Sequence, residues 1–219
     1  MRKITFLYYP VLFCMIFPIF LSGCVSISSS PESRFYALRL AGKDRITPKF
    51  DITPDTIIGV GPVKIPQYLN RPQIVTQDEN NMLTFAQFDR WGEPLDAALA
   101  RLINEHLTAM LPGATIETFP WNISIPVRYR LIIDVVRMES ELDKDLFFVA
   151  QWSIIDLEKK DAVFSKRSQF REPIILHNYG GLTEALGNVC ASLSSEMAEA
   201  MSRVVMAPET KTETSGSKK

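Results

Sequence analysis

The stretch that decides the predicted fold is Arg128-Tyr-Arg-Leu-Ile-Ile-Asp-Val-Val-Arg-Met-Glu-Ser-Glu141. Its apolar side chains recur at every second position: Tyr129, Leu131, Ile133 and Val135. A period of two places such side chains on one face of a β-strand. Residues 145–157 repeat the alternation with Phe148, Ala150, Trp152 and Ile154. Both segments are therefore predicted to be strands with one buried face.

Working outward, six further segments have strand patterns: 34–40, 56–65, 73–76, 82–85, 114–119 and 162–171. Gly59, Gly61 and Pro62 interrupt the second of these, and such residues usually mark a bulge or a sheet edge. The polar run 78–81 between two short apolar segments predicts a hairpin turn.

Two helices are expected, at 93–111 and 182–205. The first follows Pro94, which suits a helix start, and has a stripe at three- and four-residue spacing: Leu95, Leu99, Leu102, Ile103, Leu107 and Met110. The stripe of the second is Leu186, Val189, Leu193, Met197, Met201 and Val204. The lone Cys190 lies beside this stripe, so we expect it to be packed rather than reactive.

Together these elements predict an α+β fold of two layers, a mostly antiparallel sheet packed by two main helices. One such domain is expected over residues 34–206. Residues 207–219 lack apolar anchors and are predicted to be a disordered tail.

The N-terminus begins with Arg2 and Lys3, continues with an apolar run from Ile4, and ends at Leu21-Ser-Gly-Cys24. This is the organisation of a secretory signal peptide, and its last four residues resemble the bacterial lipobox. The resemblance implies cleavage after residue 23 and a Cys24 that carries S-diacylglycerol and an N-acyl chain such as palmitate. Residues 24–33 would then be the acylated cysteine and a flexible tether.

Two other readings of this segment are open. Residues 4–21 have the length of a transmembrane helix, although Pro10 and Pro18 interrupt the run and no polybasic segment follows. Cys24 could also be an ordinary cysteine beside a plain signal peptide.

Charge and chemistry-bearing residues exclude several function classes. Removing residues 1–23 takes away two of 24 basic residues and none of the 25 acidic ones, which leaves a net charge of −3 and no expectation of nucleic acid as a partner. His106 and His177 are the only histidines, and no zinc motif, nucleophile elbow or phosphate loop is present. We therefore expect no catalytic residues, no metal, no cofactor and no enzyme activity.

Three segments resemble a known family when taken together: Val60-Gly-Pro-Val-Lys-Ile-Pro-Gln-Tyr-Leu-Asn-Arg-Pro-Gln-Ile-Val75, Phe88-Asp-Arg-Trp-Gly-Glu-Pro-Leu95, and Tyr129–Val135 with Trp152 downstream. Behind a lipobox and the strand Arg34-Phe-Tyr-Ala-Leu38, this order is similar to the ABC-type transport auxiliary lipoproteins, the PqiC family.

The resemblance implies a non-enzymatic envelope lipoprotein of an intermembrane lipid transport system. Its partner would be an MCE-domain protein that spans the periplasm, and its role would include support of membrane integrity. Because Val25 rather than Asp follows the cysteine, the family's sorting rule favours the inner leaflet of the outer membrane. Whether the domain binds lipid itself or only guides the conduit is open, and a guiding role favours a homo-oligomeric ring.

Tyr68, Leu69, Arg71 and Pro72 are the candidate partner-binding residues, because they occupy an inter-strand loop and Tyr and Arg are enriched at interface hot spots. The competing interpretation is that Tyr68 and Leu69 plug the end of the sheet while Arg71 pairs with a carboxylate such as Asp89. Trp91 is expected to anchor the helix start in the core.

Two other functions compete with transport. The chain could be an assembly or pilot lipoprotein that stabilises another outer-membrane complex, or an envelope hydrolase with an unrecognised site that uses a histidine.

Overall fold

The computed structural model describes residues 31–42, 49–78 and 80–206. The predicted signal peptide, Cys24, most of the tether and the predicted tail lie outside these residues. From Ser33 onward the described chain forms one compact unit. Neither of its helices has an apolar stretch of the length that a membrane span requires.

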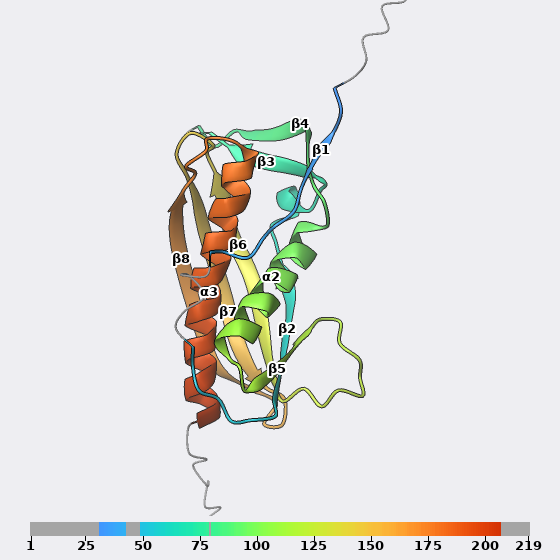
Figure 1. Cartoon of the computed structure of the whole chain (residues 1–219), viewed down its shortest axis with the longest axis vertical. Coiled ribbons are helices and arrows are strands. Elements are labelled where there is room, and N and C mark those ends of the chain that lie inside the picture. The colour runs from blue at the N-terminus through green and yellow to red at the C-terminus, as the bar shows by residue number, and fades with distance from the viewer. Residues whose placement is uncertain (1–30, 43–48, 79, 207–219) are drawn as a thin grey trace, which may run out of the picture. The chain divides into compact units, whose positions relative to one another are not determined.

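Eight strands, two α-helices and one short 3-10 helix make up the described chain (Figure 1). In order they are β1 (Arg34–Tyr36), β2 (Thr56–Lys64), η2 (Gln67–Leu69), β3 (Gln73–Gln77), β4 (Leu83–Trp91), α2 (Leu95–Met110), β5 (Ala114–Thr118), β6 (Tyr129–Ser140), β7 (Asp145–Asp156), β8 (Asp161–Pro173) and α3 (Tyr179–Met206).

The predicted α+β class is confirmed, because α2 and α3 pack together on one face of a five-stranded sheet ordered β5-β2-β6-β7-β8 (Figure 1). A second sheet, ordered β1-β4-β3, stands beside it. The pairing is mixed rather than mostly antiparallel. β1–β4, β2–β5 and β2–β6 are parallel, and β3–β4, β6–β7 and β7–β8 are antiparallel.

The parallel pairs arise from two crossovers. The chain between β2 and β5 passes through the small sheet and α2, and such a crossover returns the chain in the same direction. The loop between β5 and β6 then passes over β2. Trp121 of this loop packs on Gly59, where a Cβ atom would lie 2.7 Å from the indole ring. The bulge expected in this strand is confirmed by a register shift between Val60 and Val63, but the strand lies inside the sheet, not at an edge.

The alternating strands and the helix stripes form the core as predicted. Leu131, Ile133, Trp152 and Ile154 are at most 1% exposed. Every stripe residue expected on α2 is buried, as are those on α3 except Val204, which packs partly buried against the core. The first strand is shorter than predicted, because the chain leaves the small sheet after Tyr36 and continues as an extended segment beside α2 and α3.

Local polar contacts set several element ends. In the β3–β4 turn the Asp78 carboxylate accepts the backbone N–H groups of Asn80 and Met82 at 2.9 and 2.8 Å, which is the hydrogen bonding that makes Asp a turn residue. The Asn178 side chain accepts the N–H of Gly181 at 3.0 Å and caps α3. That helix therefore begins three residues earlier than the apolar stripe alone indicated.

Candidate functional site

Tyr68 and Leu69 lie on η2 and fasten this loop to the domain. Leu69 is buried in the core, and the Tyr68 hydroxyl donates to the Met138 carbonyl at 3.2 Å. Burial is the main reason that the pKa of Tyr68 is raised. Both residues therefore attach the loop to the rest of the domain, as the competing interpretation expects, and partner binding by them stays a prediction.

Arg71 and Pro72 are exposed instead. The Arg71 guanidinium lies over the Phe85 ring of β4, 4.2 Å from its centroid. The expected pairing of Arg71 with Asp89 is wrong, because Arg34 and Tyr36 already occupy that carboxylate. Among the described residues no acidic side chain forms an ion pair with Arg71.

Asp89 joins the first strand to β4. Arg34 donates to both carboxylate oxygens at 2.7 and 2.8 Å, and the Tyr36 hydroxyl donates at 2.9 Å. These Arg34 hydrogen bonds are the main reason that the pKa of Asp89 is lowered. Side chains two residues apart on a strand share a face, which lets Arg34 and Tyr36 reach one acceptor. The contact physically links the Arg34–Leu38 and Phe88–Leu95 segments.

The other family segments also meet. The backbone N–H of Trp91 donates to the Pro72 carbonyl at 2.8 Å, so the Tyr68–Pro72 loop is held against the residues that start α2. Between them is an open groove of about 300 Å³ lined by Asn70, Arg71, Pro72, Trp91, Gly92, Glu93, Pro94 and Leu95. We call this the motif groove. Trp91 itself is 6% exposed, which confirms its role as a core anchor.

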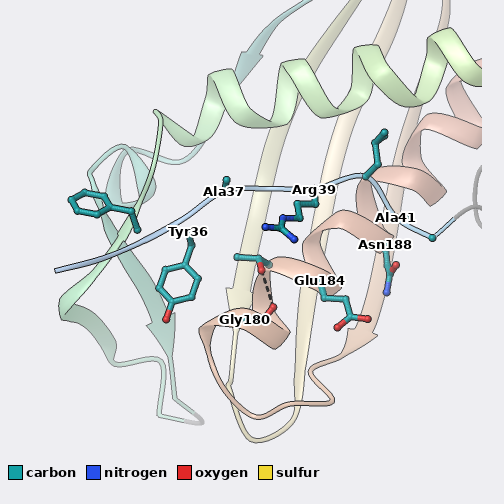
Figure 2. Close-up of a pocket in the computed structure, with 11 residues that line it drawn as sticks. Tyr36, Ala37, Arg39, Ala41, Gly180, Glu184 and Asn188 are labelled. Carbon is teal, nitrogen blue, oxygen red and sulfur yellow. Dashed lines mark hydrogen bonds between the residues drawn. The ribbon is translucent and has the colours of Figure 1, made fainter. Parts of the chain in front are cut away.

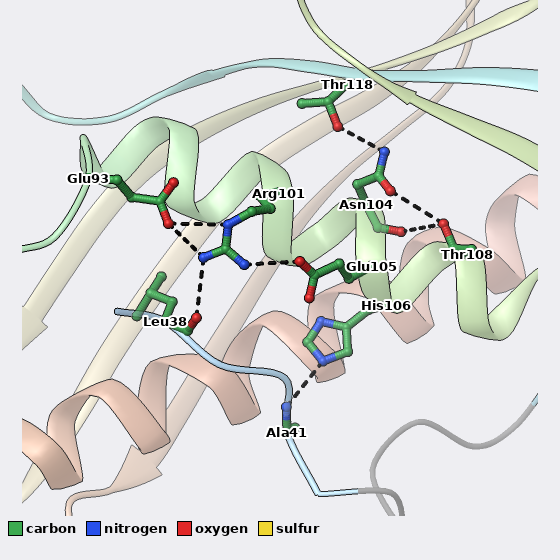
Figure 3. A network of polar contacts seen from close by, with 9 residues as sticks. All are labelled: Leu38, Ala41, Glu93, Arg101, Asn104, Glu105, His106, Thr108 and Thr118. Atoms are coloured by element: carbon green, nitrogen blue, oxygen red, sulfur yellow. Dashed lines mark hydrogen bonds and ion pairs between the residues drawn. The ribbon is translucent and has the colours of Figure 1, made fainter. Parts of the chain in front are cut away.

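Two charged side chains line the motif groove, Glu93 and Arg71, and only Glu93 forms an ion pair within the described chain. Glu93 accepts from Arg101 Nη2 at 2.6 Å, and Arg101 also binds Glu105 at 3.0 Å (Figure 3). The Glu93 contact is the main reason that the pKa of Arg101 is raised. Arg71 has no such carboxylate in the described chain. An apolar floor with a cation at its edge suits a protein segment that carries apolar and acidic groups.

The same polar network fixes the segment after β1, residues 37–42, which we call the strap. Arg101 donates to the Leu38 carbonyl at 3.2 Å, and the Ala41 N–H donates to His106 Nε2 at 3.4 Å (Figure 3). His106 is fully buried, and burial lowers its pKa. Its role in the fold is to accept a backbone hydrogen bond, while His177 lies on the exposed β8–α3 loop.

A larger cavity of about 530 Å³ lies between the strap and the first turns of α3 (Figure 2). Arg39, Thr183, Glu184 and Asn188 contribute polar groups to its wall. Pockets for apolar ligands are lined mostly by hydrophobic and aromatic side chains. This polar, open cavity is therefore unsuited to an acyl chain.

Two further features are the Cys190 thiol and the arrangement of side chains that could bind a metal ion. Cys190 is fully buried and burial raises its pKa to about 12, so its thiol is packed as expected. Within residues 31–42, 49–78 and 80–206, no three His, Cys, Asp or Glu side chains are grouped to hold a metal ion. The predicted acylation site, Cys24, lies outside the described residues.

Sequence reasoning did not assign Arg34, Tyr36 or Phe85 to this region, and it considered Asp89 only as a partner of Arg71. The one available signal was that Arg34 and Tyr36 alternate on a strand, which places both on one face. Their acceptor is 53 residues or more away in the chain, so pattern alone could not select it.

Comparison with known proteins identifies the family. Two crystal structures share the fold. An uncharacterised protein is 18% identical, with a TM-score of 0.64 over 78% of this chain and 99% of that chain. Protein XCC0632 from Xanthomonas campestris is 14% identical, with a TM-score of 0.60 over 76% and 93%. No curated protein matches the chain significantly.

The family model for the ABC-type transport auxiliary lipoprotein component matches residues 36–198. This range includes Asp89, the motif groove, the core strands and most of α3. The chain therefore belongs to the family of ABC-type transport auxiliary lipoproteins.

Proposed function

We propose that this protein is the non-enzymatic lipoprotein subunit of an intermembrane phospholipid transport system that supports membrane integrity. Its work is to bind an MCE-domain protein that spans the periplasm. Family membership supports the transport role. The observation that carries the docking role is that two motif segments, separated in the chain, meet at one open groove with Arg71 at its rim.

The anchor in this proposal is Cys24, with S-diacylglycerol on its sulfur and an acyl chain on its amino group. Several chains hold a protein stably on a bilayer, whereas one chain holds it marginally. Val25 after the cysteine favours the inner leaflet of the outer membrane. Mass spectrometry of the mature protein tests the anchor, and an unmodified residue 24 would remove it.

The motif groove is the proposed docking surface. A partner side chain that enters the groove would contact Pro72, Pro94 and the edge of Trp91, while Arg71 is free to bind a carboxylate. Arginine is enriched at interface hot spots, and its planar fork matches a carboxylate. Phe85 holds the guanidinium in place before binding, which reduces the entropy that docking must overcome.

Site-specific photo-crosslinking in cells tests this docking. A photoreactive amino acid replaces Asn70 in one strain and Arg137 in the control strain. Asn70 is exposed and lines the motif groove beside Arg71, which stays in place to bind. Arg137 is also exposed but belongs to β6 and does not line the groove. The proposal expects an MCE-domain protein to be captured from position 70 and not from 137.

Other captured neighbours would contradict the proposal in a defined way. A barrel or secretin subunit captured from position 70 would favour an assembly or pilot lipoprotein. Capture of the MCE protein from both positions would show that the domain lies near this protein but not that it binds through the motif groove.

We also propose that several copies surround the conduit, because a subunit that guides a continuous path gains from encircling it. Sedimentation velocity of the anchor-free domain at high concentration should show a species larger than a monomer. Only monomer would argue against the ring.

A further inference from the structure

Two large aliphatic side chains stand exposed on the loop between β8 and α3. Ile175 is 69% exposed and Leu176 is 58% exposed, whereas the preceding Ile174 is buried. We call this pair the apolar tip. The loop is fixed at its start, where the Ile174 N–H donates to the Lys144 carbonyl at 3.0 Å. This hydrogen bond holds the apolar tip in place on the domain. Clustered exposed apolar side chains are a feature of surfaces that contact proteins or membranes.

The apolar tip lies at the end of the domain where the tether joins. Tyr179 follows Leu176 by three residues, and its ring centroid is 6.0 Å from that of Tyr36. Tyr36 ends β1, the first strand after the predicted tether. Figure 1 shows β1 and the start of α3 toward one end of the domain, with the β5–β6 loop toward the other. Phe35, which precedes Tyr36 on β1, is also 68% exposed.

Three cations on the elements beside the apolar tip are paired within the domain. Lys144 binds Glu141 at 3.0 Å and Arg171 binds Asp145 at 2.7 Å. Arg34 is bound to Asp89. These three cations already have internal partners, so the tip itself offers another surface mainly apolar contact.

We propose that the apolar tip enters the headgroup boundary of the lipid bilayer, so that the domain stands on the membrane with this end toward it. The inference rests on the lipid anchor in the proposed function. Nine residues lie between Cys24 and Arg34, and the ten steps from one to the other reach at most about 36 Å when extended. The anchor thus keeps this end near the bilayer, and a high local concentration lets a contact of two side chains suffice.

A bilayer fits the apolar tip better than a protein partner does. Aliphatic side chains that project from a loop beside a lipid anchor can enter the boundary between headgroups and acyl chains without directional partners. The motif groove, by contrast, combines an apolar floor with a placed cation. The apolar tip is therefore assigned to lipid contact and the motif groove to protein contact.

Fluorescence of an environment-sensitive label tests the contact without acylation. The chain from Val25 onward is made with a hexahistidine in place of residues 1–24, and nickel-chelating lipid holds it on vesicles of phosphatidylethanolamine and phosphatidylglycerol. The described core, which runs from Leu38 to Met201, is kept whole in this protein. A nitrobenzoxadiazole label is attached to Leu176→Cys or, as control, to Ile123→Cys.

The structure supplies the control position and the reason that only the introduced cysteine is labelled. Ile123 is 98% exposed on the β5–β6 loop. Cys190 is fully buried with a pKa near 12, so only the introduced thiol reacts. We expect a severalfold rise and a blue shift of emission on vesicle binding for the label at 176, no change at 123, and a smaller rise at 176 when Ile175→Asp is added.

Unchanged emission at 176 on protein-bound vesicles, or an equal rise at 123, would overturn the inference. So would a rise at 176 that Ile175→Asp leaves intact. Because the hexahistidine replaces the acyl anchor, these outcomes are separate from the fate of the proposed function, which the mass of residue 24 and the crosslinks from position 70 decide.

Discussion

At the scale of single residues, Asp89 connects the start of the domain to its small sheet. The residue is 4% exposed, yet its two oxygens are satisfied by Arg34 and Tyr36. A buried carboxylate is tolerated when it is paired and hydrogen-bonded. One acidic side chain therefore decides whether the segment leading to the tether stays on the domain.

Asp89→Asn should lower the free energy of unfolding by about 1–3 kcal/mol, the usual cost of weakening a buried charge-assisted hydrogen bond. The folded pKa of Asp89 is depressed, so its contribution is present above the unfolded pKa of about 3.9 and is lost as pH falls through the folded pKa. Urea unfolding from pH 7 to pH 2 should show a shallower acid limb in the variant. Asp134→Asn, at an exposed position of β6, should leave that limb unchanged.

His106 makes stability depend on pH in a higher window. Its folded pKa is lowered by burial, so below the unfolded pKa of about 6.5 the unfolded chain binds more protons. Stability should then fall with decreasing pH, by at most about 1.4 kcal/mol per pH unit, until the folded pKa is reached.

His106→Gln tests this window, because the amide oxygen can still accept the Ala41 N–H but cannot gain a proton. Denaturant midpoints between pH 7 and pH 5 should become nearly flat in this variant. The control His177→Asn alters the exposed histidine and should keep the slope of the unaltered protein. A slope that survives in H106Q would place its origin in another group.

At the scale of elements, the strap shows how a segment without regular structure is held. It crosses close to α3, where a Cβ atom on Gly187 would lie 2.8 Å from the Arg39 carbonyl oxygen. It is also hydrogen-bonded to α2 through Arg101 and His106. Both helices therefore depend on one crossing chain for part of their packing.

Gly187→Ala should destabilise the protein, although alanine raises helix propensity by about 1 kcal/mol relative to glycine. The new methyl group meets backbone of the strap, which cannot rotate away as a side chain can. Thermal unfolding and hydrogen exchange of residues 38–42 would measure the loss. Ser192→Ala, in the same helix but bonded only to the Asn188 carbonyl, should be neutral or stabilising. A stabilised G187A would show that the strap moves at no cost.

At the scale of the whole molecule, the mixed topology places different surfaces on different parts of the domain. The parallel crossover through α2 brings the start of that helix against the Tyr68–Pro72 loop and creates the motif groove. The five-stranded sheet and two helices supply a rigid body on which loops can be positioned accurately. This arrangement presents the motif groove as an open surface on a rigid body.

Arg71→Ala should leave the free energy of unfolding within about 1 kcal/mol of the parent, which is the size of an exposed cation–π contact. On the proposed function it should nevertheless reduce copurification with the proposed MCE-domain partner at least about tenfold, as expected for a hot-spot arginine. Arg137→Ala removes a similar exposed contact over Phe147 and should copurify normally. Equal binding by both variants would remove the motif groove from the docking model.

The periodic segments were predictable because burial acts on them locally. The period-two strands β6 and β7 and the stripes of α2 and α3 are buried as expected, since one face of each must leave water. Trp91 and Cys190 were placed in the core for the same reason. Arg71 was given the wrong partner, because nothing in a single sequence shows that Arg34 and Tyr36 reach Asp89 first.

By itself, the sequence determined the buried faces of β6, β7, α2 and α3, and that Arg71 lies in an inter-strand loop. These properties depend on spacing along the chain. Only the tertiary structure decided the division into two sheets, the parallel pairs, the groove between Pro72 and Trp91 and the position of the apolar tip beside β1. Each of these is a contact between distant residues, whose free energy exists only after the chain has closed the loops that separate them.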